Sequence, residues 1–439
     1  MSEGTAKGFG EKPQPKKEER RKFQAIKGTR DLVPPETALW TRVEKTAQEV
    51  FTAYGFGEIR LPIFEQTDLF ARSIGLETDV VSKEMYSFDD RDDTSVSLRP
   101  EATASVCRAY IENGMQQLPQ PVKLYTFGPM FRRERPQKGR YRQFYQIDAE
   151  VLGGSEAPGI DAELIEMVMT FFGRLGLEGV GLDINCIGDK KCRPKYVELL
   201  REELRKVKDK LGPDSQRRIE TNPLRVLDSK LENEQKLIEE MPHIGDHLCE
   251  ECAENYRGVK KELELRGVKY RENWRLVRGL DYYSRTTFEI TAKGLGSQNA
   301  VCGGGRYDGL MELLGGPPTR ATGFAIGEDR LILSLQEGGK TPSAQGRDVY
   351  IAWMGEKAYA TSVRAAKNLR AAGFSVELPP VEQKFGKALG QADKLGARYA
   401  LILGDNEVVS GEWTLKTLAT GEQAKFSEAT FLEFLKKHG

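Results

Sequence analysis

The chain has 439 residues, more than one hydrophobic core usually serves, so we expect two or three domains. Its 66 basic and 66 acidic residues balance to a net charge of zero, which argues against a protein that coats polyanions indiscriminately and leaves room for a selective nucleic-acid partner. No apolar run approaches the roughly 18 residues of a membrane span, and residues 1–22 lack the apolar centre of a signal peptide. We therefore expect a cytoplasmic protein.

Residues 1–22 are rich in Lys, Glu, Pro and Gly and are expected to form a disordered tail. Its basic residues offer RNA contacts, but a solubilising role is favoured. Apolar residues then recur at three- and four-residue intervals from Leu39 to Tyr54, which predicts an amphipathic helix ending near Gly55. A strand is predicted over Ile59–Phe64, with Pro62 at an edge or bulge.

Two later regions predict a sheet interrupted by helices. Short runs of β-branched and aromatic residues between Val122 and Val151, and again from Leu276 to Ile290, are typical of antiparallel strands. From Cys192 to Tyr270 the chain becomes rich in Lys and Glu with helical spacing, notably over residues 231–241 and 256–266. We interpret 192–270 as a helical module inserted between the two halves of the sheet.

The C-terminal part begins after a linker, since residues 337–346 are dominated by Gly, Ser, Thr and Pro. Strands and helices then alternate, which predicts a small α/β domain with a mostly parallel sheet. The strands are expected at 349–354, 374–378 and 399–403, the helices at 358–372 and 385–395, and a hairpin turn near Gly421. An α/β module for some other ligand is the alternative.

Six cysteines without a secretion signal are expected to be free thiols. One group suggests a metal site: His243 and His247 precede the Cys-x2-Cys pair Cys249 and Cys252, with Cys186 and Cys192 upstream. A single Cys-x2-Cys without a second, regularly spaced pair is a weak zinc signal, so no metal is predicted and the question stays open.

The segment from Phe131 to Phe144 carries the clearest chemistry. It contains Arg-x-Glu at 132–134, a short basic loop, and Arg140 four residues before Phe144. Guanidinium groups bind phosphate oxygens in pairs of hydrogen bonds, a carboxylate accepts from an exocyclic amine, and a phenyl ring stacks on a purine. The segment therefore suggests a site for a nucleoside triphosphate. A solvated charged hairpin is the plainer alternative, although the interleaved aromatics oppose it.

This segment resembles the second signature of class II aminoacyl-tRNA synthetases. Residues 276–283, Leu-Val-Arg-Gly-Leu-Asp-Tyr-Tyr, and 303–310, Gly-Gly-Gly-Arg-Tyr-Asp-Gly-Leu, resemble the two signatures of the histidyl-tRNA synthetase family, bacterial type. Residues 323–331 resemble class II motif 3. The likeness extends from about Phe23 to the C-terminus.

The resemblance implies an α+β catalytic domain, in which helices flank an antiparallel sheet of six or seven strands. It implies a catalytic domain over 23–335 containing the insertion 192–270, a linker over 336–347 and an α/β anticodon-binding domain over 348–439. It further implies a homodimer formed through the helix and strand after Pro35, which resemble motif 1. In the C-terminal domain Trp413, Lys416 and Lys425 are candidate RNA contacts, although Trp413 is equally a core candidate.

The implied activity is ligation of histidine to tRNA(His). L-histidine reacts with ATP, supplied with Mg2+, to give histidyl-adenylate and pyrophosphate, and histidine then passes to the 3' end of the tRNA. No prosthetic group is implied.

Arg278 and Arg132 are the implied catalytic residues, holding the α-phosphate from two sides. The implied ATP-binding residues are Arg132, Glu134, Arg140, Phe144 and Arg330. The implied histidine-binding residues are Glu101, Ala102, Thr103, Arg132, Gln146, Glu150, Arg278, Tyr282 and Tyr283. Arg135 and Gln137 would contact the tRNA acceptor end.

Each of these residues also has a plainer interpretation. Glu101 follows Arg-Pro and is placed to favour a helix start, and the two tyrosines at 282 and 283 suit a core. Three positions depart from the family pattern: Ala102 replaces a common Gly, Arg133 a common His and Asp329 a common Glu. Two further functions compete: a catalytically inactive, synthetase-like regulatory subunit of an ATP phosphoribosyltransferase, and a synthetase for another amino acid. Retention of Arg278 and of residues 348–439 opposes the first, and Glu150 with the two histidine-type signatures opposes the second.

Overall fold

The computed structural model describes residues 23–75, 78, 80–295, 299–340 and 346–438. The predicted N-terminal tail and the centre of the predicted linker lie outside these ranges. Within them, no helix is both long enough and apolar enough to cross a membrane. The helices are α1 Glu36–Ala53, α2 Thr67–Ile74, α3 Thr103–Glu112, α4 Pro158–Leu175, α5 Arg193–Lys206, α6 Pro213–Thr221, α7 Glu232–Glu239, α8 Glu250–Leu265, α9 Leu310–Leu313, α10 Glu328–Glu337, α11 Glu356–Ala371, α12 Phe385–Lys394, α13 Asp405–Ser410 and α14 Glu428–His438.

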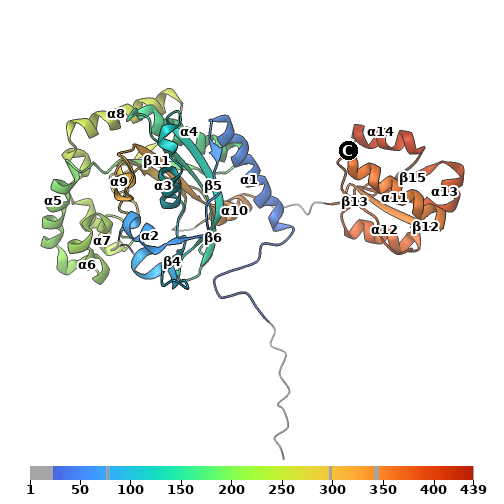
Figure 1. Cartoon of the computed structure of the whole chain (residues 1–439), viewed down its shortest axis with the longest axis horizontal. Helices are drawn as coiled ribbons and strands as arrows, with labels where there is room; N and C mark the ends of the chain where they lie inside the picture. Colours follow the sequence, from blue (N-terminus) through green and yellow to red (C-terminus); the bar gives the residue numbers. More distant parts are fainter. Residues whose placement is uncertain (1–22, 76–77, 79, 296–298, 341–345, 439) are drawn as a thin grey trace, which may run out of the picture.

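A large sheet organises the first three quarters of the chain (Figure 1). Its strands are β1 Gly57–Glu58, β5 Val122–Phe131, β6 Gln143–Leu152, β7 Gly181–Cys186, β8 Arg271–Glu272, β9 Ser284–Thr291, β10 Ala300–Arg306 and β11 Ala321–Gly327. They lie in the order β1-β5-β6-β11-β10-β9-β7-β8. The six central strands are antiparallel, and the two-residue strands β1 and β8 pair in parallel at the edges. The expected antiparallel sheet with flanking helices is thereby confirmed with six antiparallel strands, and the two short parallel edge strands bring the total to eight, against the six or seven expected.

Apolar and polar side chains alternate along β6, so that one face of the sheet packs on the hydrophobic core and the other face is polar. Successive side chains of a strand point to opposite faces. Ile147, Ala149 and Val151 face α1, α4 and α10, where they join a core that includes Phe51 and Phe171. The intervening residues Gln146, Asp148 and Glu150 therefore lie on the other face, where they are buried as polar groups. This second face holds the cavity described below.

The helix predicted from Leu39 to Tyr54 is confirmed as α1, whose buried residues include Leu39, Val43 and Phe51. The strand predicted over Ile59–Phe64 is wrong as one element. β1 ends at Glu58, before the predicted strand begins, and β2, Phe64–Gln66, starts only at the last residue of the predicted strand. β2 pairs with β4, Ser95–Leu98, and β4 also pairs with β3, Tyr86–Asp89. The carbonyls of Leu61 and Pro62 instead accept hydrogen bonds from the buried guanidinium of Arg99, at 3.3 Å each.

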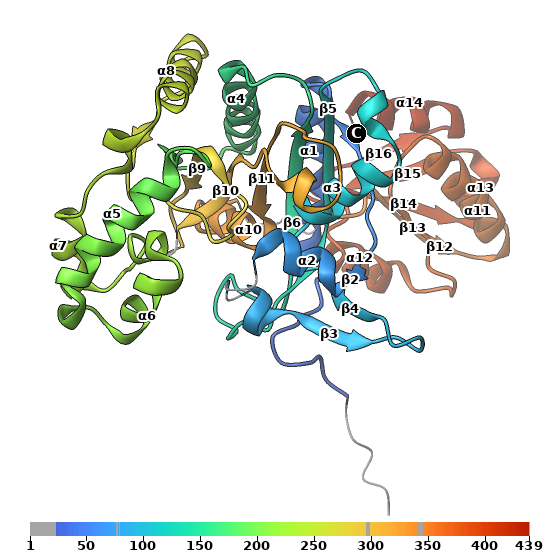
Figure 2. The same ribbon diagram turned by 60° about the vertical axis from the view of Figure 1, so that its left-hand side comes forward.

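The segment predicted as an inserted helical module is helical in the structure. Helices α5 to α7 form a lobe beside the sheet, and α8 returns across α4 (Figure 2). Leu200 and Leu204 of α5 and Ile238 of α7 lie in the core shared with the second face of the sheet. The lobe is thus packed against the same side as the polar residues of β6.

The C-terminal residues form a body with its own sheet, in the order β13-β12-β14-β15-β16. The strands are β12 Val349–Met354, β13 Val376–Glu377, β14 Tyr399–Gly404, β15 Trp413–Thr417 and β16 Gln423–Phe426. The first three are parallel and the last two form the predicted hairpin. α11 and α14 cover one face and α12 the other, each over an apolar cluster. The predicted α/β architecture is confirmed, and helices α13 and α14 were not foreseen.

Candidate active site

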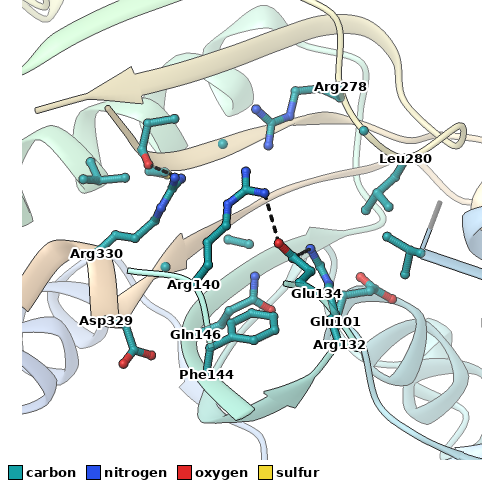
Figure 3. A pocket seen from close by; sticks show the side chains of 18 of the residues that line it. Glu101, Arg132, Glu134, Arg140, Phe144, Gln146, Arg278, Leu280, Asp329 and Arg330 are labelled. Atoms are coloured by element: carbon teal, nitrogen blue, oxygen red, sulfur yellow. Dashed lines mark hydrogen bonds and ion pairs between the residues drawn. The ribbon is translucent and has the colours of Figure 1, made fainter. Parts of the chain in front are cut away.

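A cavity of about 440 Å³ opens on the polar face of the large sheet (Figure 3). Its walls come from the loop between β5 and β6, the start of α3, the loop before β9, strand β10 and the start of α10. Eleven of the residues predicted from sequence line it: Glu101, Thr103, Arg132, Glu134, Arg140, Phe144, Gln146, Arg278, Tyr282, Tyr283 and Arg330. Segments separated by more than two hundred residues in the chain thus contribute to one cavity.

The hairpin of β5 and β6 sets the positions of the arginine-rich loop. Register across the pair joins Phe131 to Gln143 and Met130 to Phe144, so residues 132–142 form the connecting loop. Arg132 donates from Nε to the carbonyl of Pro100 at 3.0 Å, and its guanidinium lies over the Phe144 ring at 5.2 Å from the centroid. Two contacts therefore fix the direction of the Arg132 side chain.

Arg140, Arg278 and Arg330 come from three different segments, and their guanidinium groups point into the cavity (Figure 3). Arg140 pairs with Glu134 at 3.0 Å, and Arg330 donates to the carbonyl of Ala300 at 2.8 Å. Burial lowers the pKa of Arg330, and the charge of Arg140 acts in the same direction. Concentrating positive charge in a partly desolvated cavity makes it a strong site for a polyanion.

Arg278 is held by a residue that the sequence did not single out. Glu289 of β9 accepts a hydrogen bond from Arg278 at 3.0 Å and also lines the cavity. On its other side, Arg278 lies against Gly303 of β10, where a Cβ atom would collide with the guanidinium. The signal for Glu289 was a carboxylate flanked directly by two apolar residues, Phe288 and Ile290.

A second part of the cavity is built for small polar groups. Glu101 accepts from the backbone N–H groups of Thr103 and Ala104 at 2.9 and 2.8 Å. Burial raises the pKa of Glu101, and these hydrogen bonds oppose the shift. Tyr282 lies within 3.5 Å of the Glu101 carboxylate, and burial raises the pKa of Tyr283 to about 12, so both phenols are neutral donors at physiological pH.

Glu150 lies beneath the cavity wall rather than in it. Its carboxyl accepts from the hydroxyl of Thr103 at 2.7 Å and from that of Tyr307 at 2.5 Å. Burial raises the pKa of Glu150 well above its ordinary value. Tyr307 was missed from the sequence, although it belongs to the quoted segment 303–310. In this structure Glu150 reaches the cavity through the hydroxyl of Thr103.

Three other predicted residues also lie away from the cavity wall. Ala102 is fully buried at the start of α3, whereas Arg135 and Gln137 are exposed at the tip of the loop after β5. Among the candidate RNA contacts, Lys416 is half-buried, Lys425 is exposed, and Trp413 is only 3% exposed. Trp413 packs against Phe431 in the C-terminal core. An RNA contact by Trp413 is therefore wrong, because its ring is already covered.

The antiparallel sheet, the arginine-bearing hairpin loop and the separate C-terminal α/β body define a class II aminoacyl-tRNA synthetase. A family model described as histidyl-tRNA synthetase matches residues 28–189 and 196–331, and one described as an anticodon binding domain matches 348–438. The chain belongs to the histidyl-tRNA synthetase family.

Relatives of similar length support this assignment. The chain is 54% identical to the histidine–tRNA ligase of Solibacter usitatus, covering 92% of this chain and 97% of the relative. It is 50% identical to that of Koribacter versatilis, covering 95% and 97%. The crystal structure of apo S. aureus histidyl-tRNA synthetase superposes with a TM-score of 0.79 at 38% identity, covering 94% of this chain and all of that one.

Proposed function

We propose that this protein is a histidine–tRNA ligase that activates L-histidine with ATP and transfers it to tRNA(His). The observation that carries the proposal is the convergence of Arg132, Arg140, Arg278 and Arg330 on one cavity beside a buried carboxylate. Guanidinium groups suit a triphosphate, and the carboxylate with neutral phenols suits a small amino acid. The family assignment supplies the identity of that amino acid.

In the first step a carboxylate oxygen of histidine attacks the α-phosphorus of ATP, and pyrophosphate leaves. Negative charge gathers on the α-phosphate in the transition state, and little covalent work is left for side chains. Arg132 and Arg278, on opposite sides of the cavity, would hold that phosphate. Arg330 would bind the γ-phosphate, and Phe144 and Glu134 the adenine ring and its amine. Mg2+ enters as part of the ATP substrate.

Histidine would bind beside Glu101, at the start of α3. The Glu101 carboxylate would accept from the substrate ammonium group, with Thr103 and Gln146 completing that side. Tyr283 and the buried pair of Glu150 and Thr103 would meet the imidazole. A site that hydrogen-bonds both ring nitrogens rejects amino acids that lack one, because its buried partners are then left unpaired.

In the second step a hydroxyl of the terminal ribose attacks the carbonyl carbon of the adenylate, and AMP leaves. Arg135 and Gln137, exposed on the loop that carries Arg132, would contact the acceptor end. The C-terminal body would contact the anticodon. We also propose a homodimer through α1 and the segment that follows it, as the resemblance to motif 1 suggests.

Exchange of pyrophosphate into ATP, measured with each of the twenty amino acids, tests the proposal. We expect exchange with histidine and with no other amino acid. Exchange with a different amino acid would replace the substrate assignment. Absence of exchange with all twenty would contradict the activity and favour a regulatory role for the fold.

A further inference from the structure

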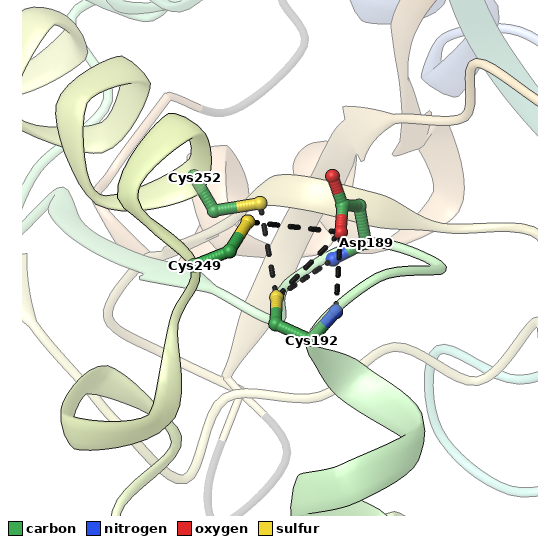
Figure 4. A group of neighbouring side chains, drawn as sticks. All are labelled: Asp189, Cys192, Cys249 and Cys252. Atoms are coloured by element: carbon green, nitrogen blue, oxygen red, sulfur yellow. Dashed lines mark hydrogen bonds between the residues drawn. The ribbon is translucent and has the colours of Figure 1, made fainter.

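A second group of reactive side chains lies at the starts of α5 and α8 (Figure 4), and none of its members lines the arginine-rich cavity. Asp189, Cys192, Cys249 and Cys252 each offer one ligand atom, and these four atoms lie within 4.8 Å of one another. Cys192 and Cys252 are buried, and the other two are half-buried. No residue of this group enters the proposed reaction.

Three of the six distances between ligand atoms are close to the edges of a zinc tetrahedron, and all six are below 4.8 Å. The Sγ atoms of Cys192 and Cys252 are 3.9 Å apart, and Oδ1 of Asp189 lies 3.6 Å from Cys192 Sγ and 4.0 Å from Cys249 Sγ. Zinc–sulfur bonds of about 2.3 Å and zinc–oxygen bonds of about 2.0 Å at tetrahedral angles require edges of about 3.5–3.8 Å. The side chains would have to move inward by about 1 Å or less to bring these atoms to the distances that an ion at the centre requires.

The backbone presents the four ligands as two matching units. Asp189-x2-Cys192 ends where α5 begins, and Cys249-x2-Cys252 spans the start of α8. In the first unit the N–H of Asp189 donates to Cys192 Sγ at 3.5 Å, and the N–H of Lys191 donates to Asp189 Oδ1 at 2.9 Å. Two short loops that each give a pair of ligands are the usual frame of a closed structural zinc site.

Charged neighbours suit a site with excess negative charge. Three thiolates and a carboxylate around Zn2+ carry a net charge of −2. The guanidinium of Arg285, 9% exposed, lies 3.6 Å from Oδ2 of Asp189 and so leaves Oδ1 for the ion. Lys191 of the first unit pairs with Glu251 of the second at 2.7 Å. Such outer contacts orient metal ligands and keep them in place.

We propose that Asp189, Cys192, Cys249 and Cys252 bind a structural Zn2+ ion that joins the two ends of the helical lobe. The ion would link the loop after β7 to the start of α8. Arg193, next to Cys192, donates to the backbone carbonyl of Tyr283 at 2.5 Å, so the same junction supports the loop that carries Arg278. Soft thiolates in a closed tetrahedral set select zinc over the hard cations magnesium and calcium.

The histidines suspected from the sequence belong elsewhere. His243 stacks on Trp274 with ring centroids 3.9 Å apart, and His247 packs against Tyr196. Cys186 packs beside Cys192 and Cys252 as an apolar neighbour. A disulfide between Cys192 and Cys252 is the competing use of these thiols, and the experiment must separate it from zinc.

Metal analysis of the untagged full-length protein, purified under reducing conditions, is the direct test. We expect one zinc per chain, and we expect Cys249→Ser and Cys252→Ser to weaken zinc binding by more than about 100-fold. Cys107→Ala, which removes a buried thiol of α3 outside the cluster, should keep its zinc. Full zinc content in Cys249→Ser, or a Cys192–Cys252 disulfide found by mass spectrometry, would overturn the proposal.

Cobalt substitution covers the case in which the serine variants fail to fold. The wild-type chain loaded with Co2+ should show the visible absorption of tetrahedral cobalt together with thiolate-to-cobalt charge transfer. Asp189→Cys should keep the tetrahedral spectrum and strengthen the charge-transfer band, because a fourth thiolate joins the ion. Unchanged charge transfer in Asp189→Cys, or absence of cobalt uptake by the reduced wild-type protein, would contradict the assignment. Neither the metal content nor the cobalt spectrum depends on the ligase activity.

Discussion

Glu289 holds the guanidinium of Arg278 at 3.0 Å inside the cavity before any substrate arrives. A cation fixed in this way stabilises developing negative charge without having to reorganise during the reaction. Gly303, directly behind Arg278, leaves the space that the guanidinium occupies. The catalytic role proposed for Arg278 therefore depends on two neighbours, Glu289 and Gly303, that position its side chain without contacting the reacting atoms.

Gly303→Ala should displace Arg278 and lower histidine-dependent pyrophosphate exchange by about 10²- to 10³-fold, the usual effect of losing one preorganised charge contact. Arg278→Ala should match or exceed this loss. Gly309→Ala is the control, because a Cβ atom there meets open space. Circular dichroism should show that all three variants keep the fold. Equal exchange rates for the Gly303 and Gly309 variants would argue against the packing role of Gly303.

Glu328, at the first position of α10, gives a pH prediction. Its carboxyl is fully buried, and neither oxygen has a hydrogen-bond partner among the described residues. Burial raises the pKa of Glu328 well above its ordinary value, and the negative charge of Glu44 adds to the shift. The folded state therefore binds this proton more tightly than the unfolded state, and the free energy of unfolding falls as pH rises from about 4.3 to the raised pKa.

Glu328→Gln should remove this contribution, which is at most about 1.4 kcal/mol per pH unit. Urea unfolding of the wild type and the variant, followed from pH 4 to pH 8, measures the difference. We expect the variant to gain stability relative to the wild type as pH rises. Glu49→Gln, at an exposed position of α1, is the control for the loss of one carboxylate. Parallel profiles for wild type and Glu328→Gln would contradict the prediction.

For individual residues, the sequence was sufficient to predict the charged side chains that stand in motifs, but not the residues that contact them. Arg132, Arg140, Arg278 and Arg330 stand in motifs and were all identified. Tyr307 was missed because its contact with Glu150 spans 157 residues and depends on how β11 pairs with β6 on one side and with β10 on the other. Hydrogen bonds between distant strands leave no periodic trace in the sequence.

Among the elements of the fold, the loop between β5 and β6 carries both residues that line the cavity and residues that are exposed to solvent. Its inward side chains, including Arg140, line the cavity, whereas Arg135 and Gln137 are exposed at its tip. A short bridge between Gln137 and Arg140 shapes that tip. One loop is therefore able to serve ATP on one side and a macromolecular substrate on the other.

The double variant Arg135→Ala with Gln137→Ala should slow transfer to tRNA(His) by about tenfold or more, as expected for losing charge-assisted hydrogen bonds. Pyrophosphate exchange should stay near the wild-type rate, since neither side chain lines the cavity. Single-turnover transfer from preformed adenylate separates the two steps. Arg91→Ala, exposed on the turn between β3 and β4, is the control. A parallel loss in both steps would place these residues in the ATP site instead.

Periodicity predicted the long helices α1, α11 and α12 within a few residues. It failed over 59–64, where a proline and two carbonyls bound by Arg99 replace strand pairing. The two-residue strands β1 and β8 were also missed. Such short parallel edges exist only because the neighbouring strand supplies the hydrogen bonds, so no local pattern specifies them.

Across the whole molecule, the chain forms separate hydrophobic clusters on either side of residues 341–345. The clusters of residues 349–435 draw on no residue of the large sheet. Each part thus has a hydrophobic core of its own, as expected of separate domains.

Deleting residues 348–439 should spare pyrophosphate exchange with histidine and weaken charging of tRNA(His), mainly through a higher KM for tRNA. Charging assays at varied tRNA concentration measure this effect. The excised segment, added back as a separate chain, should restore little, because the covalent connection supplies the high effective concentration. Equal charging by the truncated and complete chains would contradict an anticodon-binding role for this part.

The metal-ligand cluster shows the limit of sequence reasoning at the largest scale. Cys192, Cys249 and Cys252 were noticed in the sequence, but the fourth member of the cluster, Asp189, was not, and it lies 60 residues before Cys249. A mixed Asp-x2-Cys unit matches no standard spacing, so the nearby histidines drew attention instead. Only the packing of the start of α5 against the start of α8 brings the four side chains together.

The alternation of β6 has one further consequence. A slip of one residue in its pairing with β5 or β11 would turn Gln146, Asp148 and Glu150 toward the apolar layer under α1 and α4 and send Ile147 and Val151 to the polar face. In the slipped pairings Glu150 would lose its hydrogen bonds to Thr103 and Tyr307, and Asp148 would lose the nearby charges of Arg99 and Arg132, which makes these pairings unfavourable. The polar side chains on the cavity side of β6 thus also direct the chain toward one strand register as it folds.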